Sequence, residues 1–135
     1  MTKLELFQRY AEAWLPVFVA RHEIIWSEVN IFDFFVGAGM DVAGKEGSAL
    51  RLLRAFEGQK AYLGRPGLHV SLRLSGADGE NVKQLKRALA ARQADALPVN
   101  IEIKQADFAE RFAAVKGELA KSSSANLLII DQFGI

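Results

Sequence analysis

The sequence predicts an α/β fold, and three of its patterns carry that prediction. Stretches whose apolar residues recur at three- and four-residue steps alternate with short apolar or alternating runs, as helices alternating with strands do. Strands that alternate with helices form parallel sheets. The first and the fourth of these runs are apolar on both faces, as the interior of a parallel sheet requires. Right-handed crossovers then favour the strand order 3-2-1-4, which is half of a doubly wound, Rossmann-like sheet.

The first half of the chain supplies an N-terminal helix, a strand, a glycine-rich loop and a second helix. Residues 3–22 carry one apolar stripe at helical spacing, and a kink or break is expected at Pro16. Residues 30–36 form an aromatic, apolar run that predicts a buried strand. Ser48 is the expected N-cap of the helix that follows the loop.

The second half repeats the alternation. Strands are expected over 68–74, 99–104 and 126–131. The strands over 68–74 and 99–104 alternate apolar and polar residues, as strands near a sheet edge can. Two amphipathic helices separate these strands, and the second begins with Asp107 and Glu110, the D-x-x-E pattern of a capping box.

Composition excludes several classes of protein. A chain of 135 residues leaves room for one domain. Its 17 Lys and Arg residues nearly balance 16 Asp and Glu residues, which removes net charge as an argument for nucleic acid or an acidic membrane. There is no cysteine and the two histidines lie far apart, so we expect no disulfide, thiol nucleophile or metal site. The first ten residues lack the apolar core of a signal peptide, and no apolar run is long enough to span a membrane, so a cytoplasmic protein is expected.

The glycine-rich loop after the first strand is the strongest candidate for binding. Gly37 and Gly39 fit the first two positions of the G-x-G-x-x-G dinucleotide fingerprint, but Val42 occupies the third. A phosphate-binding G-x-x-x-x-G-K-[ST] loop is absent as well. A ligand with a neutral or zwitterionic end therefore suits the loop better than a phosphate. The alternative is a turn that binds nothing.

Three motifs in the same order resemble the three-Cys-motif partner (TcmP) proteins. The resemblance covers almost the whole chain, and its motifs are Trp14–Phe18, Phe32–Gly39 with Asp41, Gly44 and Gly47–Leu53, and Ser124–Ile135. That family resembles class I S-adenosylmethionine-dependent methyltransferases. The three cysteines of its name belong to a neighbouring protein, so a chain without cysteine fits. The resemblance implies transfer of a methyl group from S-adenosylmethionine to an amine, and its fourth-strand motif leans toward an amine on a nucleobase.

The resemblance also implies roles for individual residues. Three would line the methionine end of the cofactor: Asp33, Gly37 and Gly39. Two would lie at its adenine: Asp107 and Phe108. Four stand where amino-group methyltransferases carry their catalytic motif, and these are Asp131, Gln132, Phe133 and Gly134.

Some residues depart from the family pattern or have a second explanation. Gly76 stands where an acid gripping the ribose hydroxyls is expected, and Asp78 is the nearest substitute. Asp107 is first of all a helix N-cap. Asp33 interrupts an apolar strand, and a buried carboxylate needs a partner, which favours a functional role. A basic helix face is expected to be solvated rather than to bind nucleic acid, and it carries Lys83, Lys86, Arg87 and Arg92.

The number of strands and the exposed edge of the predicted sheet indicate what the chain associates with. Four strands are about half of a methyltransferase sheet, so we expect the N-terminal cofactor-binding half of a domain that is inactive alone. The fourth strand would be an apolar edge, and such edges pair with other chains. Either the natural chain continues past Ile135 or this strand pairs with a second copy. A three-Cys-motif protein is a further candidate partner. The alternative function is a non-catalytic scaffold that mediates association.

Overall fold

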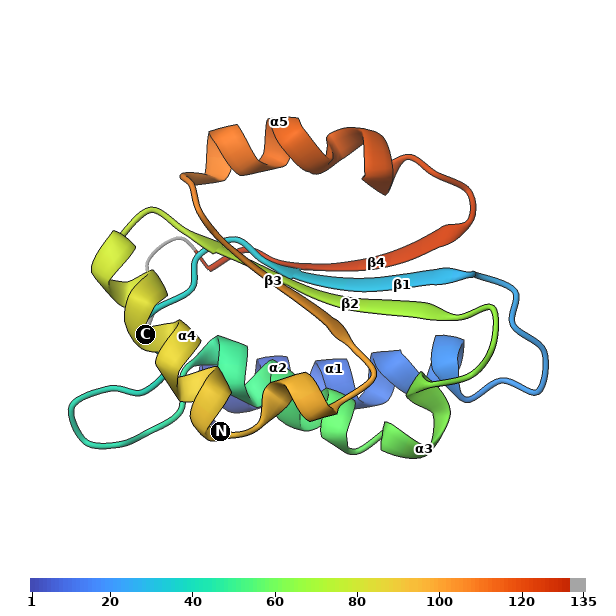
Figure 1. Ribbon diagram of the computed structural model, residues 1–135, viewed down its shortest axis with the longest axis horizontal. Helices are drawn as coiled ribbons and strands as arrows, with labels where there is room; N and C mark the ends of the chain where they lie inside the picture. The colour runs from blue at the N-terminus through green and yellow to red at the C-terminus, as the bar shows by residue number, and fades with distance from the viewer. Residues whose placement is uncertain (132–135) are drawn as a thin grey trace.

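The computed structural model describes residues 1–131 and has the predicted topology (Figure 1). A four-stranded, all-parallel sheet has the order β3-β2-β1-β4. The elements, in chain order, are α1 (Lys3–Val19), β1 (Glu28–Asp33), α2 (Ser48–Glu57), α3 (Lys60–Leu63), β2 (His69–Gly76), α4 (Gly79–Ala91), the 3-10 helix η1 (Ala94–Ala96), β3 (Asn100–Gln105), α5 (Phe108–Leu119) and β4 (Ser124–Ile129).

Helices cover both faces of the sheet, as right-handed crossovers require. In Figure 1, α1, α2 and α4 lie on one face and α5 lies alone on the other. The connections β1-α2-β2 and β2-α4-β3 build the sheet outward in one direction. The connection through α5 then returns the chain to the far side of β1. The direction of building therefore reverses between β1 and β4.

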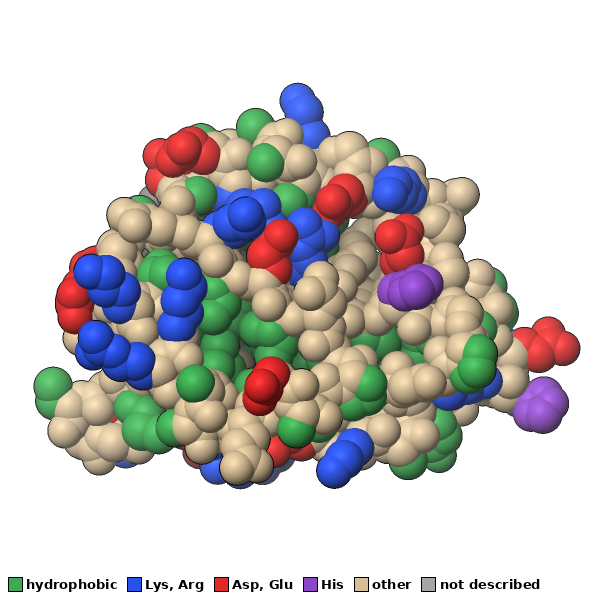
Figure 2. Space-filling model, in the orientation of Figure 1, with side chains coloured by type: hydrophobic (Ala, Val, Ile, Leu, Met, Phe, Trp, Pro, Cys, Tyr) green, Lys and Arg blue, Asp and Glu red, His purple; other side chains and the backbone are tan. Residues whose placement is uncertain are grey.

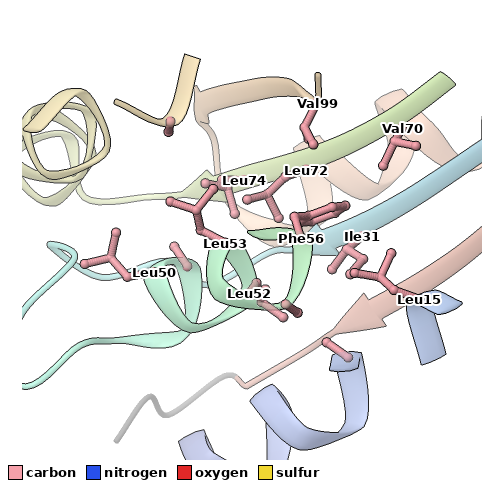
Figure 3. Packing of buried hydrophobic residues seen from close by; sticks show 14 of the residues in the cluster. Leu15, Ile31, Leu50, Leu52, Leu53, Phe56, Val70, Leu72, Leu74 and Val99 are labelled. Carbon is pink, nitrogen blue, oxygen red and sulfur yellow. The ribbon is translucent and has the colours of Figure 1, made fainter. Parts of the chain in front are cut away.

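The main core fills the space between the sheet and its three-helix layer (Figure 3). Leu53 and Phe56 of α2 point toward Ile31 and Leu72 of the central strands, and Leu15 of α1 closes the cluster; all five are fully or almost fully buried. Burying such side chains stabilises the fold by about 1.5–3 kcal/mol each, before the entropy cost of ordering the chain.

The α5 face is apolar over β1 and β4 and ionic over β2 and β3. Phe32 packs with the other members of a small aromatic cluster under α5. Beside it, Arg73 of β2 pairs with Glu102 of β3 at 3.1 Å and with Glu118 of α5. Arg111 of α5 also pairs with Glu102. This network replaces an apolar helix contact and explains why β2 and β3 alternate, although β2 lies inside the sheet.

Several local predictions were wrong. α1 ends at Val19 rather than 22, because Arg65 donates hydrogen bonds to the carbonyl groups of Val19, Arg21 and His22. Of the kink or break expected at Pro16, the break is wrong, because α1 is one helix that contains Pro16.

The strand boundaries moved as well. The first strand covers Glu28–Asp33 instead of 30–36, and the last covers Ser124–Ile129 instead of 126–131. The N-cap of α2 is Gly47, and Ser48 is the first helical residue.

Candidate functional site

Asp33 ends β1 with its side chain buried against the start of α2. Its relative exposure is 1%. The Ser48 hydroxyl donates to one carboxylate oxygen, and the Phe35 N–H donates to the other at 3.2 Å. Burial raises the pKa of the Asp33 carboxyl to about 6, although both hydrogen bonds oppose the rise and the Asp131 charge adds to it. Asp33 therefore connects the end of β1 to the start of α2. Ser48, which was predicted to cap α2, uses its hydroxyl for this connection instead.

The glycine loop, residues 37–47, folds back on itself. The Gly47 N–H donates to the Gly39 carbonyl at 2.7 Å, and Met40 and Glu46 form an antiparallel bridge. At the tip, one Asp41 carboxylate oxygen accepts from the N–H groups of Ala43 and Lys45 at 2.9 Å each. The loop is thus a closed hairpin rather than an extended phosphate cradle.

Gly39 is the residue that this hairpin requires to be glycine. Its φ is +104°, a conformation that side chains disfavour. A Cβ there would lie 3.1 Å from the Ala88 Cβ of α4. The second glycine of the motif therefore lets the loop pack against α4.

Arginines hold the base of the loop. The Glu46 carboxylate pairs with Arg54 of α2, at 2.5 Å, and with Arg92 at the end of α4. Arg51 of α2 donates to the Glu46 backbone carbonyl at 3.0 Å. Arg92, predicted to be solvated, is therefore an anchor for the loop. Lys83, Lys86 and Arg87 are exposed, as predicted. In Figure 2, Lys and Arg side chains gather over α4.

A cavity of about 540 Å³ opens between this loop and the first turn of α1. Its volume lies in the range of small-molecule sites. Of the predicted cofactor residues, Gly37 and Gly39 line it. Both charge signs are present, and the lining residues are Thr2, Leu4, Glu5, Gly37, Ala38, Gly39, Met40, Asp41, Lys45, Glu46, Gly47 and Arg51.

The other predicted acids already have partners within the chain. Asp78 is the N-cap of α4 and accepts from the N–H groups of Glu80 and Asn81. Asp107 forms the predicted capping box with Glu110 at the start of α5. Asp131 pairs with Lys3 of α1, with Nζ and Oδ1 2.9 Å apart. None of these three acids lines the cavity.

The end of β2 has no room for an acidic side chain. A Cβ on Gly76 would lie 2.9 Å from the Val36 carbonyl oxygen, because the chain after β1 crosses there. The Val36 N–H also donates to the Ser75 carbonyl at 3.0 Å. Packing against Val36 therefore requires glycine at position 76, where the family pattern has an acidic residue.

Phe108 lies in the aromatic cluster rather than at the cavity. Its ring stacks on Phe35 at 5.5 Å and meets the edge of Phe34 at 5.2 Å. The structure therefore brings Gly37 and Gly39 together at one cavity and leaves Phe108 outside it. The predicted catalytic residues Gln132, Phe133 and Gly134 lie outside the described residues.

Sequence reasoning missed Glu46 and Arg51, which line the cavity, and Lys3, which pairs with the predicted catalytic residue Asp131. Lys3 and its partner Asp131 are 128 positions apart, and no local pattern connects them. Arg51 lies within the family-like motif, but only the folded loop shows that it binds the Glu46 carbonyl.

A second cavity of about 440 Å³ lies beside the end of α4, η1 and β3. Its lining is mainly apolar and includes Leu89, Val99 and Ile101. Figure 2 shows hydrophobic side chains on the floor of a hollow beside α4. No residue with a predicted role lines this cavity, so the candidate site is the one at the glycine loop.

Fold and site define an α/β protein with a glycine-lined cavity at the carboxyl edge of a 3-2-1-4 sheet. No protein-family model matches the chain, and no curated protein matches it significantly. Within residues 1–131, no three His, Asp or Glu side chains gather as a metal site requires. No helix in the same range is long and apolar enough to cross a membrane.

Proposed function

We propose that this chain is the cofactor-binding half of a class I methyltransferase-like domain of the TcmP type, and that it binds S-adenosylmethionine or its product. One observation carries the proposal: Gly37 and Gly39 line a cavity of ligand size after β1. β1 borders the switch point of the sheet, where ligands of such folds bind.

The cavity suits the methionine end of that cofactor. This end carries an amino and a carboxylate group, and the lining offers acidic Glu5 and Asp41 as well as basic Lys45 and Arg51. Gly47, the N-cap of α2, lines the cavity and has no side chain to cap the helix. A carboxylate beside such a helix start is electrostatically favoured.

The ribose end fits less well. Gly76 has no room for an acid, and Asp78 already caps α4. Affinity would therefore come from the methionine end and be weaker than in a protein with a ribose-binding acid. The substrate proposed from the family resemblance is an amine, such as one on a nucleobase. Because its four described strands are about half of a methyltransferase sheet, we propose that this chain alone does not transfer methyl groups.

Titration calorimetry with S-adenosylmethionine tests the proposal. Gly37→Leu should reduce affinity at least tenfold, because the new side chain enters the cavity wall. No atom lies within 4 Å of a Cβ at Gly37, so the fold should tolerate the change. Gly117→Leu on α5 is the matched control, since a Cβ there also meets open space. Equal affinity of the two variants for S-adenosylmethionine would show that the cofactor does not bind in this cavity.

A second candidate function is a non-catalytic scaffold. It is favoured by the intramolecular partners of four acids, since a carboxylate that accepts hydrogen bonds or forms an ion pair within the chain needs no ligand. These acids are Asp33, Asp78, Asp107 and Asp131. Absence of binding heat at millimolar S-adenosylmethionine would support this candidate over the first. A three-Cys-motif protein is then the partner to test.

A further inference from the structure

The outer edge of β4 is open in the part of the chain that the structure describes. β4 pairs only with β1, and it is the last strand in the order β3-β2-β1-β4. The Glu28 N–H donates to the Ser123 carbonyl, and the Phe34 N–H donates to the Ile129 carbonyl. These two bonds show that the odd-numbered residues of β4 direct their backbone groups toward β1. The peptide groups of Asn126 and Leu128 therefore point away from β1, because bonding direction alternates along a strand.

The two edges of the sheet differ in how they are protected. β3 carries Glu102 and Lys104, and Pro98 precedes it. Charged side chains and proline are the usual means of preventing an edge strand from pairing. β4, by contrast, contains no charged residue and no proline between Ser124 and Ile129. Of the two edges in the described sheet, the β4 edge is therefore the one suited to receive another strand.

The flank of α1 beside this edge begins with Lys3 and then exposes two large apolar side chains. Lys3, Tyr10 and Val17 are seven residues apart, or about two helical turns, so they form one line along the helix. Lys3 reaches Asp131 just after β4, which places this line on the β4 side, whereas Gln8 meets Arg51 of α2 on the other side. Tyr10 is 57% exposed and Val17 52%.

The flank of α5 above the same edge exposes one aromatic side chain, Phe112. Arg111 and Glu118 face β2 and β3, where they pair with Glu102 and Arg73. Phe112 follows Arg111 by about 100° around the helix and thus lies on the opposite flank. It is 37% exposed. An open, uncharged strand edge therefore lies between helix flanks that expose Tyr10 and Val17 on one side and Phe112 on the other.

We propose that a second copy of this chain pairs its β4 with this edge, in antiparallel orientation about a two-fold axis normal to the sheet. The two sheets then join into one of eight strands. The line Tyr10–Val17 of α1 packs against the same line of the second copy, and Phe112 approaches its own counterpart. This proposal does not depend on cofactor binding. In it the second copy, rather than further strands of the same chain, continues the sheet beyond β4.

The chemistry of β4 favours its own copy as the occupant. A strand entering between two apolar flanks needs apolar side chains on both faces, and β4 has Leu127 and Ile129 on one face and Leu128 on the other. A two-fold interface brings the same patch of both subunits together. Antiparallel pairing also brings Lys121, before one β4, near Asp131, after the other, which is favourable.

Sedimentation velocity at tens of micromolar protein tests this proposal. The wild type should sediment with twice the chain mass of 14.9 kDa. Tyr10→Lys with Val17→Lys places like charges against their counterparts, so the dissociation constant should rise at least tenfold. Tyr62→Lys with Val42→Lys is the matched control, because both native side chains are exposed and lie on other segments.

Amide hydrogen exchange at the β4 edge is the second measurement. The amides of Asn126 and Leu128 should exchange slowly in the wild type and in the control, and quickly in the Tyr10/Val17 variant. A monomeric wild type at these concentrations would overturn the proposal. So would a Tyr10/Val17 variant that stays dimeric with both amides protected, since the flanks would then carry no part of the interface.

Discussion

At the scale of single residues, the burial of Asp33 couples stability to pH. Its pKa is raised from 3.8 to about 6 by burial. Between those values the folded protein holds a proton that the unfolded chain has lost, so the free energy of unfolding falls as pH rises. Above the folded pKa the loss is complete, and it amounts to about 2–3 kcal/mol.

The test is Asp33→Asn, which keeps an acceptor for the Phe35 N–H and a group that can bond Ser48. Its stability relative to wild type should rise from about pH 4 to about pH 7. Urea unfolding of both proteins across that range measures the difference. A difference that stays constant with pH would show that the buried carboxyl does not titrate there. Asp33→Ala, which leaves both donors unpaired, should instead be destabilised by about 1–3 kcal/mol.

A second residue-scale prediction concerns Gly76. Gly76→Ala should destabilise the protein by about 1–3 kcal/mol, because the new Cβ meets the Val36 carbonyl at 2.9 Å. Gly117→Ala should instead stabilise it by about 0.5–1 kcal/mol, since that site is open and helical. Thermal unfolding of both variants checks the pair, and equal melting temperatures would contradict the packing argument.

At the scale of elements, substitutions of Asp107 at the start of α5 can distinguish its structural role as an N-cap from a role in binding. Asp107→Ala should cost about 1 kcal/mol, because the N-cap acceptor is lost, and Asp107→Ser should restore most of that stability. If Asp107 also contacts the adenine of S-adenosylmethionine, Asp107→Ser will keep stability but bind the cofactor less tightly. Chemical unfolding and calorimetry on the same samples measure both. Full affinity in the serine variant would assign Asp107 to capping alone.

Local patterns predicted some elements well and missed others for physical reasons. The D-x-x-E pattern at Asp107 acts within one helical turn, so the sequence contains everything that determines it. The end of α1 depends on Arg65, which is distant in sequence. The short elements α3 and η1 carry too few residues for a periodic pattern and were not predicted.

At the scale of the whole molecule, the strand order was predictable because it follows from element order and handedness. The site was predictable only in part. Gly37 and Gly39 border the cavity because they follow β1 directly. The partners of Asp33 and Asp131 arise from contacts between distant segments, and no spacing rule could supply them.

The central claim is that S-adenosylmethionine binds at the glycine loop, and nuclear magnetic resonance of the isotope-labelled protein tests it most directly. Titration with the cofactor should shift the amide signals of Gly37, Gly39 and Gly47, which line the cavity. The signals of Ala61 and Tyr62 on α3 should stay in place, since neither residue lines it. Unchanged glycine-loop signals at millimolar cofactor, or shifts that gather elsewhere, would contradict the account.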